Sequence, residues 1–170
     1  MSETLEPALP DHLDEQADRL MHAICDRKLR IATAESCTGG MLAALLTDID
    51  GAGHGFERGF VTYTTDSKAE LLGIDPDLLK KNEAVSEVVA RAMAEGALAR
   101  SHADIALGVT GFAGPAGDDH EQGLVHIALA RRDGPTIHRV EHFGAIGRGP
   151  VRVNSLKTML EMLDQALALN

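Results

Sequence analysis

A serine and a cysteine stand side by side in a segment that could support nucleophilic chemistry. Ser36 and Cys37 lie within residues 33–40, TAESCTGG, between a short apolar run and a longer one, a pattern that predicts strand, sharp turn and helix. The first N–H groups of a helix lack partners and can hold a phosphate or an oxyanion. The segment therefore predicts a nucleophile beside its own oxyanion donors or, more simply, Ser36 or Thr38 as the helix N-cap.

Cys37 offers a second nucleophile, because a helix N-terminus lowers the pKa of a thiol. The alternative for this cysteine is a small buried side chain in the core. The residues alone leave a serine amidase, a cysteine amidase and a simple cap open.

A lysine follows at a second predicted strand-to-helix junction. Lys68 lies in the first turn of a helix expected from Ser67, where the helix dipole opposes a positive charge. With an ordinary pKa near 10.4, a lysine is neutral about once in 2,500 molecules at pH 7. Burial would have to lower the pKa for Lys68 to act as a base; the alternative is a solvated surface lysine. Tyr63, the only tyrosine, is by itself expected in the core with its hydroxyl at the rim.

A glycine-rich loop follows a strand that is apolar on both faces. Residues 108–117, GVTGFAGPAG, place a glycine at every third position and include Thr110, Gly111 and Gly114. Such a loop lets a ligand approach the backbone and can form an anion nest. It matches neither the P-loop nor the dinucleotide-binding fingerprint, and the alternative is a tight turn.

The histidines do not predict a metal site. No His-Glu-x-x-His occurs, and His138 and His142 are four residues apart on an expected strand, which separates them by about 13 Å. Residues 118–121, DDHE, could hold a divalent cation weakly, but a solvated loop is the simpler interpretation.

Helices and strands are expected to alternate around these segments. This alternation predicts an α/β sandwich with a mostly parallel sheet and one hairpin. The expected strands are 30–34, 59–64, 105–109, 124–131 and 136–143, and the expected helices are 13–25, 41–46, 67–72, 85–97 and one that opens at Pro150.

Length and charge limit what these elements can serve. A chain of 170 residues fits about one domain, expected at 13–170 after a flexible acidic tail at 1–12. The net charge of −10 argues against nucleic-acid or anionic-membrane partners. We see neither a signal peptide nor a membrane span, and two cysteines are no disulfide framework. We therefore expect a cytoplasmic protein.

Five segments together resemble the CinA C-terminal domain family over about residues 13–167. They are 34–40, 56–63, 68–73, 84–87 and 109–115. The family's characterised activity is that of a nicotinamide-nucleotide amidohydrolase. The resemblance implies a three-layer α/β/α sandwich with a mostly parallel sheet. It also implies deamidation of nicotinamide mononucleotide to nicotinic acid mononucleotide and ammonia, with no metal or organic cofactor. Its partner is then a small-molecule nucleotide, and a homo-oligomer stays open.

The resemblance also assigns roles to residues. Ser36 matches the family's nucleophile, Lys68 and Tyr63 its activating partners, and Thr110 a polar residue that lines the site. Ser36 would attack the carboxamide while neutral Lys68, helped by Tyr63, takes its proton. The residues expected to bind substrate are Cys37, Thr38, Gly39, Thr110, Gly111, Gly114, Arg148 and Arg152.

Two departures from the family pattern bear on substrate binding. A Gly-Gly pair that usually follows Gly114-Pro115 is replaced by residues 116–119, AGDD, whose negative charge would weaken phosphate binding. The family's Gly-Asp-Arg near the last helix is Ile146-Gly147-Arg148 here, so the aspartate is lost. The alternative function is a catalytically silent nucleotide-binding or interaction module of the same fold, in which Ser36 only caps a helix.

Overall fold

The computed structural model describes residues 9–117 and 119–168 and contains one five-stranded sheet of order β2-β1-β3-β4-β5. β1 pairs in parallel with β2 and β3, whereas β4 is antiparallel to β3 and β5. Among these described strands, β4 alone therefore runs against the rest. The strands are β1 (Ile31–Glu35), β2 (Phe56–Val61), β3 (Ile105–Gly111), β4 (Leu124–Arg131) and β5 (Gly134–His142).

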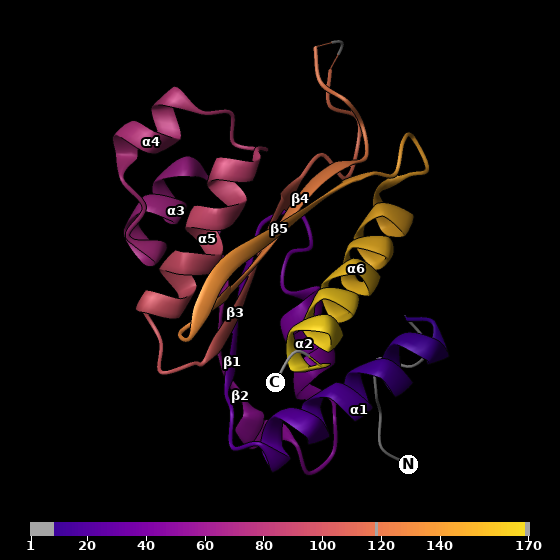
Figure 1. The fold of residues 1–170 in the computed structure, drawn as a ribbon. Coiled ribbons are helices and arrows are strands. Elements are labelled where there is room, and N and C mark those ends of the chain that lie inside the picture. The colour runs from indigo at the N-terminus through magenta and orange to yellow at the C-terminus, as the bar shows by residue number, and fades with distance from the viewer. Residues whose placement is uncertain (1–8, 118, 169–170) are drawn as a thin grey trace.

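Helices cover both faces of the sheet (Figure 1). One face carries α3 (Thr65–Leu72), α4 (Pro76–Lys81) and α5 (Glu87–Ala99), and the other carries α1 (Asp11–Asp26), α2 (Met41–Thr47) and α6 (Arg148–Ala168). A short 3-10 turn, η1 (Gly53–Gly55), precedes β2. The prediction of a three-layer α/β/α sandwich with a mostly parallel sheet is confirmed.

Alternation along the central strands sends side chains into two separate cores. Ile31 and Ile105 pack with α1, α2 and α6, while their neighbours Ala32 and Ala106 pack with α3 and α5. Successive side chains of a strand point to opposite faces, so both central strands are buried on both sides. The same alternation determines toward which face of the sheet the side chains at the strand ends point.

Small residues bring α5 onto the sheet at very short range. A Cβ added to Gly108 would lie 2.6 Å from the backbone nitrogen of Ala94 and 2.7 Å from the carbonyl oxygen of Ala90. The α5 backbone therefore rests directly on β3. A glycine at position 108 is a packing requirement, since its backbone angles are ordinary.

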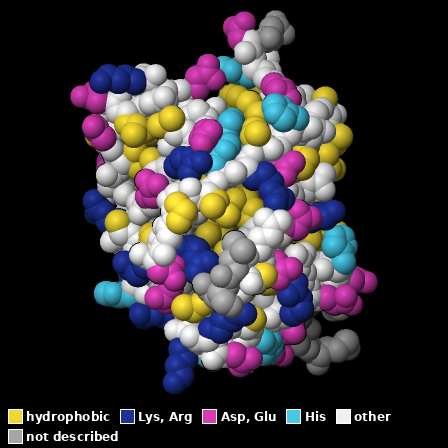
Figure 2. All heavy atoms as spheres, viewed as in Figure 1, with side chains coloured by type: hydrophobic (Ala, Val, Ile, Leu, Met, Phe, Trp, Pro, Cys, Tyr) yellow, Lys and Arg dark blue, Asp and Glu magenta, His cyan; other side chains and the backbone are white. Residues whose placement is uncertain are grey.

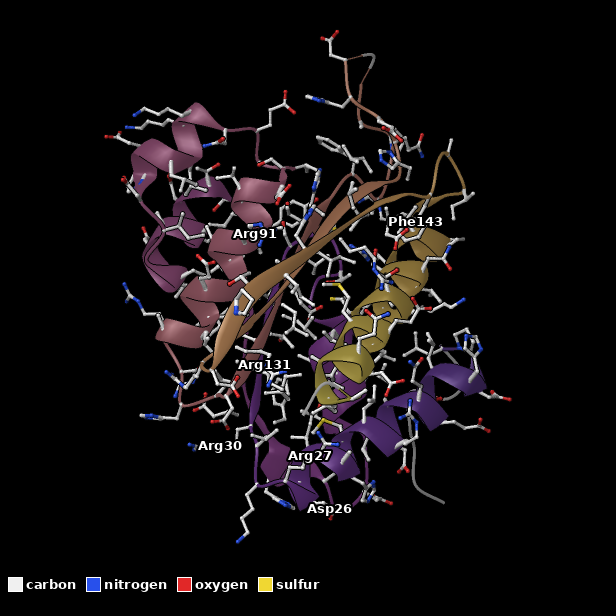
Figure 3. All side chains as sticks on the ribbon, viewed as in Figure 1. Asp26, Arg27, Arg30, Arg91, Arg131 and Phe143 are labelled. Carbon is white, nitrogen blue, oxygen red and sulfur yellow. The ribbon has the colours of Figure 1, made fainter. Side chains whose placement is uncertain are left out.

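Two histidines connect the β4–β5 hairpin to α5. His126 Nδ1 lies 3.0 Å from His138 Nε2, and His138 Nδ1 lies 3.6 Å from a carboxylate oxygen of Glu87. Arg91, labelled in Figure 3, bonds to Glu87 and donates to the Thr136 carbonyl on β5. Burial lowers the pKa of both histidines.

The start of the fold differs from the predicted boundary. The predicted flexible tail covered residues 1–12, of which 1–8 lie outside the described residues. Leu9 is buried in the core beside α1, which begins at Asp11. The described end of the predicted tail therefore packs with the domain.

Several element boundaries also move. α3 begins at Thr65, two residues before the expected start at 67, and is capped by Thr64 with Ser67 returning the bond. Gly73 ends this helix with a φ of +68°, so its last residue is 72, as expected. β2 ends at Val61 instead of residue 64, and α4 was not predicted.

The described helices do not include one with the length and apolar character needed to cross a membrane. On the face seen in Figure 2, hydrophobic side chains gather near the middle, with charged side chains around them.

Candidate active site

Ser36 lies at the first position after β1, where the chain turns sharply toward α2. Its N–H donates to the Val109 carbonyl at 3.1 Å, which continues the pairing of β1 with β3. Gly39 and Gly40 then take φ values of +63° and +94°, a region that glycine adopts without steric cost. Ser36 is therefore held at the carboxyl end of a central strand, on the α3–α5 face of the sheet.

Glu35, which the sequence analysis did not single out, caps α2. Its buried carboxylate accepts from Thr38 Oγ1 at 2.6 Å and from the backbone nitrogens of Gly40, Leu42 and Ala43 at 2.8–3.1 Å. The residue at the N-cap position is Gly40, which has no side chain to cap the helix, and Glu35 takes that role from outside the helix. The expectation that Ser36 or Thr38 caps α2 is therefore wrong. The α2 N–H groups expected to hold a phosphate are instead occupied by the chain's own carboxylate.

Lys68 reaches Ser36 from α3. Its Nζ lies 3.3 Å from Ser36 Oγ and 3.2 Å from the Tyr63 carbonyl oxygen. The side chain is only 2% exposed, so the solvated-lysine interpretation is wrong. Among the described residues no carboxylate lies within ion-pair distance of Nζ, and burial lowers the pKa of Lys68. An amine of this kind can accept a proton from a neighbouring hydroxyl.

Tyr63 contributes its backbone to this pair. Its carbonyl accepts from Lys68, while its side chain is 68% exposed, so it is not a core residue. Within the described part of the chain its hydroxyl has no hydrogen-bond partner. The structure thus brings together Ser36, Lys68 and the main chain of Tyr63, but not the tyrosine hydroxyl.

Cys37 faces the opposite side of the sheet from Ser36. Its thiol packs in the core formed with α1, α2 and α6, and burial raises the pKa of Cys37 to about 12. A thiol with such a pKa holds almost no thiolate near neutral pH. Its carbonyl accepts from Arg152 Nε at 2.7 Å. This environment argues against a Cys37 nucleophile.

A pocket of about 120 Å³ lies next to the serine turn. It is lined by Cys37, Tyr63, Arg148 and the loop residues 111–115. A Cβ on Gly114 would lie 2.5 Å from Arg148 Nη2, so the glycine lets the guanidinium rest against the loop. Arg148 is exposed, and its side chain forms no hydrogen bond or ion pair within the described residues. As far as the described residues go, this guanidinium can meet an anion.

The other residues expected to bind substrate have internal partners. Thr38 donates to Glu35, the Gly39 N–H donates to the Ser36 carbonyl, and Arg152 donates to the Cys37 carbonyl. Thr110, buried beside Ser36, donates to the Ala84 carbonyl at 2.8 Å. These four residues hold the backbone around the pocket. The pocket itself is lined by the rest of the expected set, Cys37, Gly111, Gly114 and Arg148.

A family model, "CinA C-terminal domain", matches residues 13–167. The chain belongs to the CinA family. A CinA-like protein of Akkermansia muciniphila is 47% identical over 135 residues, which cover 78% of this chain and 30% of that protein. A crystal structure of competence/damage inducible protein CihA from Agrobacterium tumefaciens is 43% identical with a TM-score of 0.89, covering 94% of this chain and 98% of that one.

A CinA superfamily protein from Escherichia coli is also similar, with 33% identity, a TM-score of 0.84 and coverage of 91% and 90% of the two chains. The chain spans only 26–35% of the length of the first curated CinA relatives it matches. The solved structures are therefore the fuller match to this CinA domain.

The histidines and acids of this CinA domain do not gather into a metal-binding group. Within the described residues, no cluster of three or more His, Cys, Asp or Glu side chains could hold an ion. Glu121 pairs with His142 at 2.8 Å, and Asp118 lies outside the described residues.

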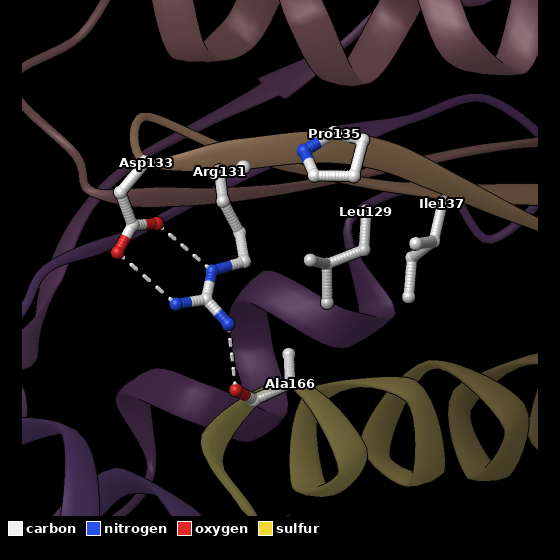
Figure 4. A pocket seen from close by; sticks show the side chains of 7 residues that line it. Leu129, Arg131, Asp133, Pro135, Ile137 and Ala166 are labelled. Carbon is white, nitrogen blue, oxygen red and sulfur yellow. Dashed lines mark hydrogen bonds and ion pairs between the residues drawn. The ribbon is translucent and has the colours of Figure 1, made fainter. Parts of the chain in front are cut away.

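A larger pocket of about 300 Å³ lies at the far end of the CinA domain's sheet, beside the β4–β5 turn and the end of α6. Arg131 there bonds to both carboxylate oxygens of Asp133 and to the Ala166 carbonyl (Figure 4). Arg131 pairs in register with Ile105 at the start of β3, so this pocket lies far from Ser36. We assign it no chemistry.

Proposed function

We propose that the chain is an amidohydrolase that converts nicotinamide mononucleotide to nicotinic acid mononucleotide and ammonia. The observation that carries the proposal is the buried Lys68 amine, 3.3 Å from Ser36 Oγ and without a carboxylate partner in the described residues. Such an amine is a base for a serine nucleophile. The substrate is inferred from the resemblance to the CinA C-terminal domain family.

In the first step Ser36 Oγ attacks the carboxamide carbon. The Oγ–C bond forms as the hydroxyl proton moves to Lys68 Nζ. The backbone N–H groups of Cys37 and Thr38 donate to no oxygen within the described residues, and they adjoin the nucleophile. They are the donors available to the oxyanion of the tetrahedral intermediate.

In the second step the C–N bond breaks. The Lys68 ammonium returns its proton to the leaving nitrogen, which departs as ammonia, and Ser36 is left as an ester. A water molecule then attacks the ester carbonyl while neutral Lys68 takes its proton. As the C–Oγ bond breaks, Lys68 returns that proton to Ser36 Oγ, and the carboxylic acid product loses its own proton to solvent and leaves as the carboxylate.

Recognition of the phosphate is assigned to the pocket beside the serine. The α2 N-terminus is filled by Glu35, so it is not available to an anion. Arg148 borders the pocket without an internal partner among the described residues, and a guanidinium suits a phosphate. We therefore assign Arg148 to the phosphate and leave Arg152 with the serine turn.

The decisive experiment measures ammonia release from nicotinamide mononucleotide by the purified chain. Ser36→Ala should abolish release with little change in Tm, and Lys68→Arg should lower kcat at least about 100-fold, because arginine cannot supply a neutral base. Cys37→Ala, which changes the neighbouring buried side chain, should retain most activity.

Two outcomes would contradict the proposal. An active Ser36→Ala together with an inactive Cys37→Ala would assign the chemistry to the thiol. If the wild-type chain binds the mononucleotide in calorimetry but releases no ammonia, it is the silent binding module.

A further inference from the structure

Three buried hydroxyls stand in a row at the carboxyl ends of three adjacent parallel strands. Ser36 follows β1, Thr62 follows β2 and Thr110 lies near the end of β3, and each is less than 9% exposed. All three share the α3–α5 face, because alternate residues of their strands, such as Ala34, Phe60 and Ala106, pack in that core. Thr110 has a partner in Ala84, and Ser36 has one in Lys68.

Thr62 has none. Its side chain is 0% exposed, and its Oγ1 is buried without a hydrogen-bond partner in the described part of the chain. The Thr62 N–H donates to the Glu35 carbonyl at 2.9 Å, which continues the β1–β2 pairing and sets Thr62 directly beside Ser36. Neighbouring strands lie about 4.8 Å apart. A buried polar group left without a partner destabilises the fold, and a hydroxyl oxygen in this position can accept a hydrogen bond from a new donor.

When Lys68 carries a charge, the described residues leave one of its N–H groups without an acceptor at hydrogen-bond distance. A neutral amine has two N–H groups, whereas the ammonium has three. Its neighbours within hydrogen-bond distance are the Tyr63 carbonyl and Ser36 Oγ. Once Ser36 attacks, its oxygen becomes part of the tetrahedral adduct and then of an ester. The ammonium therefore needs another buried oxygen at the moment it forms.

We propose that the Thr62 hydroxyl accepts the third N–H of the Lys68 ammonium and so strengthens its hold on the proton taken from Ser36. The proposal rests on the proposed function, in which Lys68 is the base. Thr62 acts through Lys68 and is a positioning residue. Its backbone is fixed by the sheet. The Thr62 and Lys68 side chains share no hydrogen bond in the structure, so this bond forms when Lys68 takes up the proton.

Other charges around Lys68 do not take this role. Cys37 lies near Lys68, but burial raises the pKa of that thiol to about 12, so it carries almost no charge near neutral pH. Asp66 and Glu70 on α3 form no ion pair with Lys68, and Glu87 on the adjacent α5 pairs with Arg91 and His138.

The chain contains a matched control for Thr62. Thr33 is also 0% exposed, and its hydroxyl also lacks a partner in the described residues. It faces the opposite side of the sheet, because a Cβ on Gly59 would contact both Thr33 Oγ1 and Ala43 of α2. Thr62→Val and Thr33→Val thus make the same change at equal burial, on the Lys68 face and on the α2 face.

The test is a pH titration of the full chain labelled with ¹³C-lysine, followed by NMR, with the Lys68 signal assigned from Lys68→Arg. Loss of an acceptor for the ammonium destabilises the charged form, so Thr62→Val should lower the pKa of Lys68 by about one pH unit or more. Thr33→Val should leave the titration unchanged, and Thr62→Ser, which keeps the hydroxyl, should restore it.

Kinetics give a second readout. In Thr62→Val the acid limb of kcat/KM for the mononucleotide should move to lower pH, and kcat on the plateau should fall about 10-fold because the base is weaker. KM should stay near the wild-type value. A merely structural role would change neither the acid limb nor the Lys68 titration.

A Lys68 titration that is the same in Thr62→Val and Thr33→Val would overturn the proposal. If Thr62→Val does not fold, Thr62→Ala compared with Thr62→Ser makes the same comparison of a lost and a kept hydroxyl. If the wild-type chain releases no ammonia, the proposed function fails, while the NMR titration still decides whether Thr62 acts on Lys68.

Discussion

Arg148 and Arg152 lie one helical turn apart at the start of α6, yet only Arg152 has a hydrogen-bond partner among the described residues. Arg152 donates to the Cys37 carbonyl at 2.7 Å and so holds the turn that carries Ser36. Arg148 lies against Gly114 at the edge of the pocket. The two arginines are therefore separable by kinetics.

Arg148→Ala should raise KM for nicotinamide mononucleotide about 10-fold or more with little change in kcat, because hydrogen bonds to charged groups contribute about 1.5–3 kcal/mol. Arg152→Ala should lower kcat and destabilise the fold by about 1 kcal/mol, the worth of an ordinary hydrogen bond. Steady-state kinetics and urea unfolding measure both. Free nicotinamide, which lacks the phosphate, should be a poor substrate that Arg148→Ala does not affect further. A KM effect in Arg152→Ala and a kcat effect in Arg148→Ala would exchange the roles of the two arginines.

At the level of single residues, the composition of a segment can be read from the sequence, whereas contacts between distant segments cannot. Ser36 and the glycines of its turn stand out locally, because the segment is too rich in small polar residues for packing alone. The approach of Lys68 to Ser36 is not visible locally, since it depends on how α3 packs against the ends of β1 and β2. Glu35 carried a readable signal, a lone acid at the end of a strand that otherwise holds Ile, Ala and Thr, but its partners lie up to eight residues further on.

Among the elements, α2 depends on one buried carboxylate for its N-terminus. Replacing Glu35 by Gln removes the charge and turns one of the two carboxylate oxygens into an N–H₂ donor. Whichever way the amide is oriented, this donor then faces a backbone N–H group, that of Ala43 or that of Leu42. We expect Glu35→Gln to lower the free energy of unfolding by about 2 kcal/mol and to reduce kcat, because the serine turn loosens.

Urea unfolding and the ammonia assay measure the two effects. Glu15→Gln makes the same substitution at an exposed position of α1 and should change neither. A Glu35→Gln protein as stable as wild type would show that α2 does not need this cap.

The contact between α5 and β3 predicts a steric effect at Gly108. Gly108→Ala would drive a methyl group into the backbone of Ala90 and Ala94, and overpacking of this kind costs about 1–3 kcal/mol. Gly134→Ala on β5 adds the same methyl where nothing lies within 4 Å and should be close to neutral. Thermal unfolding of the two variants compares them, and equal Tm values would mean that α5 can move away from the sheet at little cost.

Element boundaries were predictable where the signal is local. Ser86 caps α5 and Gly73 ends α3, and residues of these types mark helix ends locally. The expected helices at 67–72 and 85–97 therefore lie within two residues of the observed ones. For the start of α3, the segments from Thr64 and from Ser67 carry similar capping patterns. The helix is capped by Thr64, the earlier of the two, and Lys68 is buried. α4 has only six residues, too few for a periodic pattern.

For the molecule as a whole, the linked histidines predict how stability changes with pH. Burial lowers the pKa of His126 and His138 in the folded chain, so the unfolded chain binds protons more readily below about pH 6.5. Their contribution to stability is present above that pH and is lost as the pH falls from there through the lower pKa values of the folded chain. If both rings were fully protonated, His126 Nδ1 and His138 Nε2 would each carry a hydrogen, and two N–H groups would face each other across 3.0 Å.

Urea unfolding at pH 7.5 and pH 5.5 should therefore show a smaller loss of stability in His138→Gln than in wild type. His54→Gln, at an exposed position in η1, should keep the wild-type dependence. An identical loss in all three proteins would mean that other groups control the acid response.

The separation of catalytic and recognition segments along the chain has a consequence for redesign. The atoms assigned to bond breaking come from residues 36–68. Most of the pocket wall comes from residues 111–115 and Arg148, and Cys37 and Tyr63 complete it. That loop is tied to the segment after β5, because Gly123 donates to Phe112 and accepts from Phe143. Exchanging residues 112–123 together with 143–148 between homologues should therefore transfer substrate preference as one cassette and leave the nucleophile and its base unchanged.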